Sequence, residues 1–196
     1  MKSSRWLNPA NLLTLARLIA IPFAVRAILD EQHGNALAIV LAAGLTDAFD
    51  GAIARRFSMA TNVGAYFDPI VDKLFLSAVY ISLAVISKVP RWLVIEIFAR
   101  DFLILAASGA AILFLRIRRF PPSIWGKAST FLQILCALAI MISNTWPDSA
   151  FARWASALIW PVALLTGLSG IHYFWRGIRT FSSRASTPID GGLAGE

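Results

Sequence analysis

Two short acidic segments interrupt an otherwise apolar sequence: Asp47-Ala-Phe-Asp50-Gly51-Ala-Ile-Ala54-Arg55 and, eight residues later, Gly64-Ala-Tyr-Phe-Asp68-Pro-Ile-Val-Asp72. They hold four of the eleven acidic residues of the chain. Asp47 and Asp50 are three residues apart, and Asp68 and Asp72 are four apart. On helices, each pair therefore lies on one face, one turn above the other. Two helix ends carrying these pairs can direct four carboxylates at one point.

Four carboxylates at one point in an apolar chain need a positive partner. Each unpaired charge at the centre of a bilayer costs about 2.5 to 3.5 kcal/mol, so four together cost on the order of 10 kcal/mol. Small clusters of hard oxygen ligands suit Mg²⁺ or Mn²⁺, as a single ion or as a pair about 3.5 to 4 Å apart. The pattern predicts that Asp47, Asp50, Asp68 and Asp72 bind one or two such ions.

The composition places the chain in a membrane. Of its 196 residues 58% are hydrophobic and only 15% are charged, which is too apolar for a soluble domain of this length. The net charge of +7 is spread over the ends of apolar runs rather than gathered on one basic face. This distribution favours anionic membrane lipids as partners and argues against nucleic acid.

Apolar runs long enough to span a bilayer, about 20 residues each, predict an all-α integral membrane protein with six transmembrane helices. No period-two pattern predicts a strand. The Ser-, Gly- and Ala-rich end predicts a membrane domain over 1–182 and a flexible tail over 183–196. The helices are expected at 10–29, 35–55, 67–87, 92–115, 125–146 and 152–175.

The distribution of Lys and Arg predicts that both termini are cytoplasmic. The carboxylate cluster then faces the cytoplasm of an inner-membrane protein. With the N-terminus inside, the outer side receives Lys88, Arg91, Arg153 and Arg26, and the inner side receives Lys2, Arg5, Arg55, Arg56, Lys73, Arg116, Arg118, Arg119, Lys127, Arg176, Arg179 and Arg184.

The acidic stretch resembles the signature of the CDP-alcohol phosphatidyltransferases, DxxDGxxAR, eight residues, GxxxDxxxD. Every specified position from Asp47 to Asp72 is met. The resemblance implies a homodimeric membrane enzyme of phospholipid synthesis. Such an enzyme transfers a phosphatidyl group from CDP-diacylglycerol to an alcohol and releases CMP.

The same resemblance implies roles for further residues around the nucleotide-linked lipid. The planar fork of Arg55 suits a pyrophosphate, and Gly51 and Gly64 leave room for the ligand. Thr61 is expected to contact the lipid as well. The segment from Trp6 to Arg17 resembles the N-terminal signature of the family, which makes Asn11 and Thr14 candidate CDP contacts; a helix cap and a packing threonine are the alternative.

Two charged residues near the motif have more local expectations. Arg17 is expected to pair with one of the motif's acids. Asp68 precedes Pro69, so capping of a helix N-terminus is the alternative to metal binding.

Asp72 is the candidate general base. It would take the proton of the acceptor hydroxyl while that oxygen attacks the lipid-bearing phosphorus. We expect a direct displacement, because no Ser, Cys or His is placed with a base as a nucleophile requires.

Two cations of the later helices are candidates for binding an acceptor or lipid phosphate. Arg100 precedes Asp101, and its alternative partner is Glu96, one turn earlier. Lys127 lies in a Gly-Lys-x-x-Thr-x-x-Gln segment with Thr130 and Gln133, which predicts one polar stripe; snorkelling to the interface is its alternative role.

The acceptor alcohol is the finer question. In the phosphatidylglycerophosphate synthases of the family an arginine is common at the place of Ser108. In the cardiolipin synthases of eukaryotic type that arginine is missing and the earlier pair reads Arg-Asp, as Arg100-Asp101 does here. A dianionic glycerol 3-phosphate needs more cations than phosphatidylglycerol. The sequence therefore favours phosphatidylglycerol as acceptor and cardiolipin as product, with glycerol 3-phosphate as the alternative.

Two other classes of protein use intramembrane acids. A membrane prenyltransferase binds pyrophosphate through Mg²⁺, but spreads its two Asp motifs over a longer chain of about nine helices. A cation carrier without enzymatic activity has no use for Gly51, Arg55 and Gly64 at these spacings.

The two histidines and the single cysteine lack the spacing of metal ligands and are expected to have structural roles; they are His33, His172 and Cys136.

Overall fold

The computed structural model describes the backbone of residues 9–57, 64–115, 124–148 and 150–185, and the side chains of residues 13–46, 70–106, 124–148, 152 and 154–175. All regular elements in this part are helical and none is a strand, so the predicted all-α class is confirmed. The elements are α1 (Pro9–Leu29), α2 (His33–Phe57), α3 (Gly64–Val85), α4 (Arg91–Leu115), α5 (Ile124–Thr145), α6 (Ala150–Ala155), the 3₁₀ turn η1 (Ser156–Leu158) and α7 (Ile159–Ala185).

The first five helices match the predicted segments to within three residues at each end. The segment predicted as one helix over 152–175 is instead divided into α6, η1 and α7. Pro161 explains this division, because it has no N–H to donate to the carbonyl of Ala157 and its ring crowds that carbonyl. A turn of 3₁₀ helix relieves the conflict. α7 extends to Ala185, so the residues just past the predicted domain end at 182 are helical; 186–196 lie outside the described residues.

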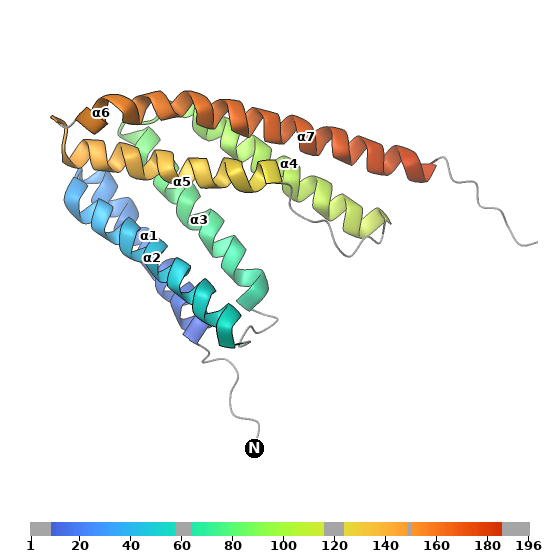
Figure 1. The fold of residues 1–196 in the computed structure, drawn as a ribbon, viewed down its shortest axis with the longest axis horizontal. Helices are drawn as coiled ribbons and strands as arrows, with labels where there is room; N and C mark the ends of the chain where they lie inside the picture. Colours follow the sequence, from blue (N-terminus) through green and yellow to red (C-terminus); the bar gives the residue numbers. More distant parts are fainter. Residues whose placement is uncertain (1–8, 58–63, 116–123, 149, 186–196) are drawn as a thin grey trace, which may run out of the picture.

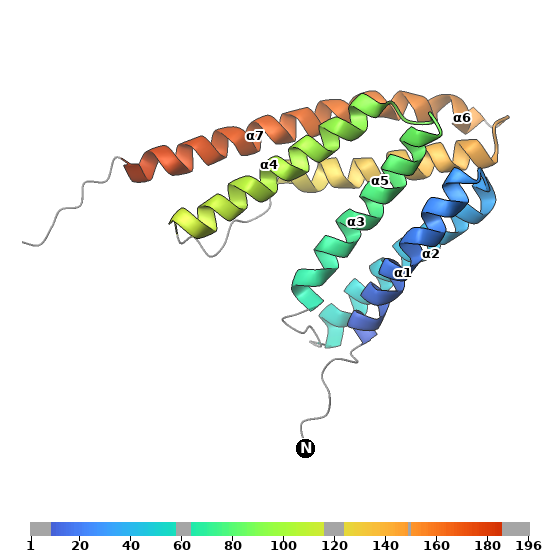
Figure 2. The same ribbon diagram turned by 180° about the vertical axis from the view of Figure 1, so that it is seen from behind.

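The helices form two groups that diverge from one end of the molecule (Figure 1). α1, α2 and α3 lie side by side, and α4 lies along α7. α5 packs against α2 and against α7, and so connects the groups. The reverse view shows α3 and α4 separating from the short turn that joins them (Figure 2). The end of α2, the start of α3 and the start of α1 lie together at the far end of the first group.

Two of the tight connections are closed by the same backbone motif. Glu31 and Ser87 both have a positive φ, of 54° and 60°. The N–H groups of Gln32 and Lys88 donate to carbonyls five residues earlier, of Ala27 and Leu83, at 2.9 Å in both cases. This is the Schellman motif, which satisfies the last carbonyls of a helix. It lets α2 begin at His33, between the helices predicted over 10–29 and 35–55.

Large apolar side chains cover the outside of the bundle. Phe102, Trp160 and Ile95 are 74%, 71% and 68% exposed, which in water would be an unusually apolar surface. Two runs, Ile124–Thr145 and Ser156–Trp175, are long and apolar enough to cross a membrane. Membrane association therefore agrees with both the surface and the helix lengths.

A buried cluster of hydrogen-bonding side chains joins α5 to α7. The hydroxyl groups of Ser129 and Thr166 are 3.1 Å apart, and the amide Nε2 of Gln133 donates to both, at 3.3 and 3.1 Å. Tyr80 of α3 donates to the backbone carbonyl of Gln133 at 2.8 Å. In an apolar surrounding such bonds fix which faces of neighbouring helices meet.

Thr166→Val should destabilise the bundle by about 1 kcal/mol, the usual size of an interhelical hydrogen bond in a membrane. The substitution keeps the shape of the side chain but removes the hydroxyl that Ser129 and Gln133 share. Thr145→Val is the matched control, because Thr145 bonds only the carbonyl of Met141 in its own helix, at 3.0 Å. Unfolding in detergent micelles measures both variants. Equal stability of the two would contradict a bonding role for Thr166.

Candidate active site

The signature segments meet at the free end of the first helix group. Asp47 and Asp50 lie in the last eleven residues of α2, and Asp68 lies in the first five of α3. The end of α2 and the start of α3 lie near the start of α1 in both views (Figures 1 and 2). α3 begins at Gly64, so Asp68 lies within the helix, and the alternative role of capping its N-terminus is wrong. The side chains of Asn11, Asp47, Asp50, Arg55 and Asp68, the surroundings of Gly51 and Gly64, and all of Thr61 lie outside the described residues.

Asp72 is the one signature carboxylate whose side chain is described. It accepts a hydrogen bond from Arg17 of α1, a residue 55 positions earlier in the chain. Arg17 is 7% exposed, whereas the Asp72 side chain is 42% exposed. The expected pairing of Arg17 with an acid of the motif is confirmed. Thr14 is half-buried one turn before Arg17, and its contact with a nucleotide stays a prediction.

A second set of charges joins α3 to α4, directly after Asp72 in the sequence. The ammonium group of Lys73 and the Nη1 of Arg100 both contact the same oxygen of Asp101, Oδ1, the latter at 2.7 Å. Arg100 is 5% exposed and Asp101 is 18% exposed. Two cations thus share one carboxylate in a largely buried position.

Arg100 also binds the two helices behind it. Its Nε and Nη2 donate to the hydroxyl of Ser169 in α7 at 3.3 and 3.0 Å, and Nη2 donates to the carbonyl of Gly126 in α5 at 3.1 Å. Its partner is Asp101, so the alternative pairing with Glu96 is wrong. The Glu96 carboxylate instead lies against Gly167 of α7.

These contacts limit what Arg100 can do for a substrate. Bonds to Asp101, Ser169 and Gly126 occupy four of the five N–H groups of a guanidinium. Arg100 therefore serves the packing of α4 against α5 and α7. A role in binding an acceptor phosphate stays a prediction, with one N–H left for it.

The polar residues at the start of α5 face different surroundings. Lys127 is exposed, Thr130 is half-buried and bonds back to the carbonyl of Gly126 at 3.1 Å, and Gln133 is buried. Thr130 and Gln133 line a small hollow between α3, α4 and α5, together with Lys73 and Asp101. The predicted polar stripe is therefore observed for Thr130 and Gln133, which line the same hollow, but not for Lys127.

Sequence reasoning missed the partners of these residues. Ser129, Thr166 and Ser169 are at most 1% exposed and complete the polar contacts of Gln133 and Arg100. Their one signal was the recurrence of polar residues at helical spacing in apolar runs: Ser129 four residues before Gln133, and Thr166 three residues before Ser169. Such residues are too common in membrane helices to have been singled out.

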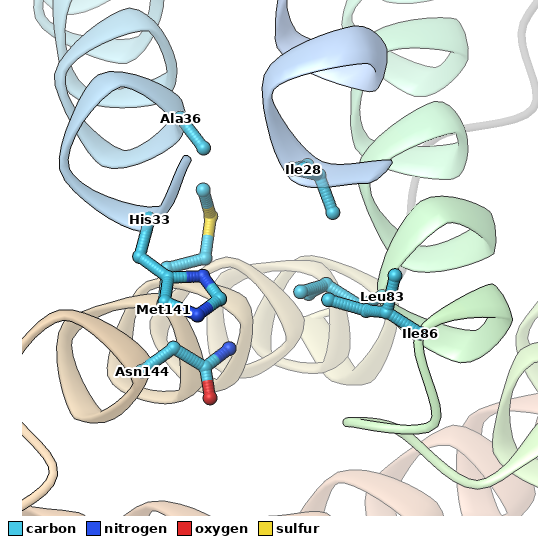
Figure 3. A pocket seen from close by; sticks show the side chains of 7 residues that line it. All are labelled: Ile28, His33, Ala36, Leu83, Ile86, Met141 and Asn144. Atoms are coloured by element: carbon cyan, nitrogen blue, oxygen red, sulfur yellow. The ribbon is translucent and has the colours of Figure 1, made fainter. Parts of the chain in front are cut away.

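The opposite end of the bundle has a mostly apolar pocket between α1, α2, α3 and α5. Figure 3 shows the His33 ring beside Met141 and Asn144, with Ile28 and Leu83 on the far side. Within the described residues, no three His, Cys, Asp or Glu side chains gather as metal ligands would. Cys136 is fully buried in the core, which agrees with its expected role in packing.

Comparison with known proteins agrees with the signature. The profile described as CDP-alcohol phosphatidyltransferase matches residues 7–168. A probable phosphatidylglycerophosphate synthase of Mycobacterium tuberculosis is 33% identical over 187 residues, covering 90% of this chain and 84% of the relative.

Two further relatives carry two different names. A CDP-diacylglycerol–glycerol-3-phosphate 3-phosphatidyltransferase of Bacillus subtilis is 29% identical, covering 88% of this chain and 98% of the relative. A CMP-forming cardiolipin synthase of Streptomyces coelicolor is 28% identical, covering 84% and 83%.

Gly126→Ala should destabilise the protein by about 1 to 2 kcal/mol. A Cβ there would lie 3.0 Å from Nη2 of Arg100 and 3.1 Å from the hydroxyl oxygen of Tyr173. Both groups are held in place, because Arg100 is bound on several sides and Tyr173 is buried. Gly44→Ala is the control, since a Cβ at Gly44 meets nothing within 4 Å. Thermal unfolding in micelles compares them, and equal melting temperatures would contradict the close approach.

Proposed function

Because the chain belongs to the CDP-alcohol phosphatidyltransferase family, and is thus a transferase of substituted phosphate groups, we propose that it transfers a phosphatidyl group from CDP-diacylglycerol to glycerol 3-phosphate. The products are phosphatidylglycerophosphate and CMP, so the enzyme acts in phospholipid synthesis. The match of every signature position between Asp47 and Asp72 supports the phosphatidyl transfer, and the names of the relatives support the acceptor. Membership of this family argues against the two other classes, a prenyltransferase and a cation carrier.

In the proposed reaction, Asp72 acts as the general base. The acceptor hydroxyl oxygen forms a bond to the phosphorus that bears diacylglycerol, and the bond from that phosphorus to CMP breaks. The proton of the hydroxyl passes to the Asp72 carboxylate, and CMP leaves with the electron pair. The contact of Arg17 with Oδ1 leaves the other carboxylate oxygen, Oδ2, to accept the proton, while the buried guanidinium fixes the orientation of the carboxylate.

The other three carboxylates are proposed as ligands of one or two Mg²⁺ or Mn²⁺ ions, with Asp72 adjoining. Their helix ends lie together, and oxygen ligands suit these ions. The bound ion would supply positive charge against the pyrophosphate. Arg55 and Thr61 would hold the nucleotide-linked lipid, with Gly51 and Gly64 leaving room for it and Asn11 and Thr14 on α1 beside it.

The choice of glycerol 3-phosphate as acceptor is based on the names of the relatives rather than on Ser108. Those named for glycerol 3-phosphate or phosphatidylglycerophosphate include proteins 33% and 34% identical to this chain. Lys127 is exposed at the start of α5 and is a candidate to meet the acceptor phosphate. Cardiolipin synthesis from phosphatidylglycerol, which the sequence favoured through Ser108, remains the second candidate, supported by the similarity to a cardiolipin synthase.

The proposed location is the inner membrane, crossed six times by α1 to α5 and α7, with both termini and the active site cytoplasmic. Successive helices run in alternating directions (Figure 1), as consecutive crossings require. The excess of Lys and Arg on the side of the termini supports this orientation. Homodimer formation stays a prediction from the family.

Asp68→Asn and Asp72→Asn should fail in different ways. Loss of a metal ligand at 68 should abolish both Mn²⁺ binding and turnover, whereas loss of the base at 72 should keep binding of Mn²⁺ and CDP-diacylglycerol but lower kcat by about 10² to 10⁴-fold. CMP release and electron paramagnetic resonance of Mn²⁺ measure the two effects, with the distant Asp30→Asn as control. Activity that survives a chelator, or normal turnover of Asp68→Asn, would contradict the metal assignment.

A CMP-release assay in mixed micelles should identify the acceptor. With CDP-diacylglycerol fixed, glycerol 3-phosphate should support turnover and phosphatidylglycerol should support little. The reverse result would establish the second candidate and leave the family reaction standing. Release of no CMP with glycerol 3-phosphate, phosphatidylglycerol, inositol phosphate or serine would contradict the proposed reaction itself.

A further inference from the structure

Five side chains of alternating charge run from α1 through α3 to α4. Arg17 contacts Asp72, Lys73 follows Asp72 in the chain, and Lys73 and Arg100 both contact Asp101. Neighbouring residues on a helix point about 100° apart, so Asp72 reaches α1 while Lys73 reaches α4. The position of Asp72 is therefore tied to two different helices through two ion pairs.

The Lys73–Asp101 pair lies far from the turn that connects its two helices. Lys73 is twelve residues before the end of α3 at Val85, and Asp101 is ten residues after the start of α4 at Arg91. At 1.5 Å per residue the pair lies about 15 to 18 Å from the connection. The helices separate along this length (Figure 2). A contact at that distance from the turn controls how far the helices open.

The α4 side of this contact is anchored. Arg100, next to Asp101, is held by Ser169 of α7 and the carbonyl of Gly126 in α5. The position of the Asp101 carboxylate is therefore fixed by the packing of α4 against α5 and α7. The α3 side carries the general base of the proposed function.

We infer that Asp101 is a positioning residue: through Lys73 it sets the opening of α3 against α4, and so the placement of Asp72. This inference rests on the proposed role of Asp72. In the part of the chain whose side chains are described, Lys73 and Asp101 contact each other and Arg100, and not the Asp72 carboxylate.

A role limited to stability predicts a different outcome. The side chain of Lys73 is 40% exposed and that of Asp101 is 18% exposed, so breaking the pair leaves no buried cavity. Because the Lys73 end of this pair is open to solvent, the pair adds little to stability. Loss of the Lys73 ammonium group leaves Arg100 paired with Asp101, so no buried charge loses its partner in Lys73→Met. Misplacement of Asp72, in contrast, lowers the turnover rate.

The kinetic test uses Asp101→Asn, Lys73→Met, the double variant and Asp101→Glu. Each of the first two should lower kcat by about ten- to a hundredfold, with the KM for CDP-diacylglycerol nearly unchanged. Lys73→Met, which keeps the buried Arg100–Asp101 pair, should also keep the melting temperature, whereas Asp101→Asn removes the anion beside Arg100 and should lower it. The double variant should lose no more than either single one, and Asp101→Glu should recover part of the rate. Losses that multiply in the double variant, or a wild-type kcat in either single one, would overturn the inference.

Asp30→Asn is the matched control, because it removes an ion pair with Arg26 at the opposite end of the bundle. The Arg26 side chain is 84% exposed, and kcat should not change. A drop in kcat equal to that of Asp101→Asn would mean that any lost ion pair affects the enzyme, and would also overturn the inference.

A second measurement does not depend on activity. Leu74 and Phe102 follow Lys73 and Asp101 and are both exposed, so spin labels on Leu74→Cys and Phe102→Cys report the opening of α3 against α4. The only native cysteine is replaced through Cys136→Ser. Asp101→Asn should shift or broaden the distance distribution and Asp30→Asn should not. An unchanged distribution would overturn the positional claim, whereas wild-type protein that releases no CMP would contradict the proposed function alone.

Discussion

A guanidinium buried among apolar helices must have an anion beside it, and two such arginines organise this molecule. Arg17 and Arg100 are 7% and 5% exposed, and leaving either unpaired in such a position costs several kcal/mol. Arg17 meets Asp72 and Arg100 meets Asp101. Because the partner of Arg17 is on α3, the pairing decides that α1 and α3 are neighbours and brings the N-terminal segment to the signature.

The two ends of the bundle are held by different kinds of interaction. At the end of the short connections, Schellman motifs at Glu31 and Ser87 close the helices and apolar side chains fill the space between them. Toward the other end the helices are joined by polar interactions. These are the hydrogen bond from Tyr80 to the carbonyl of Gln133 and the ion pairs Arg17–Asp72 and Lys73–Asp101. These polar interactions fix the orientation of the helices without filling the space between them. A site for a large lipid substrate needs such space.

The sequence predicted the helices and the pairing of Arg17, because both follow from local rules: apolar runs of spanning length, and the cost of an unpaired charge. It could not predict that Arg100 would choose Asp101 over Glu96. Both acids were within reach on the same helix, and the choice depends on Ser169 and Gly126, which come from helices distant in the chain. The division of the last helix could have been anticipated from Pro161, whose missing N–H is a local signal.

The use of Arg100 within the bundle constrains how an acceptor is bound. A guanidinium that keeps one N–H free cannot form the paired hydrogen bonds that make arginine a strong phosphate ligand. A dianionic acceptor then has to find most of its positive charge elsewhere, and Lys127 is the exposed cation at the start of α5. The ammonium group of Lys73 is already shared with Asp101, so recruiting it for a phosphate would loosen the contact between α3 and α4. Acceptor binding and the placement of Asp72 would then be coupled through one lysine.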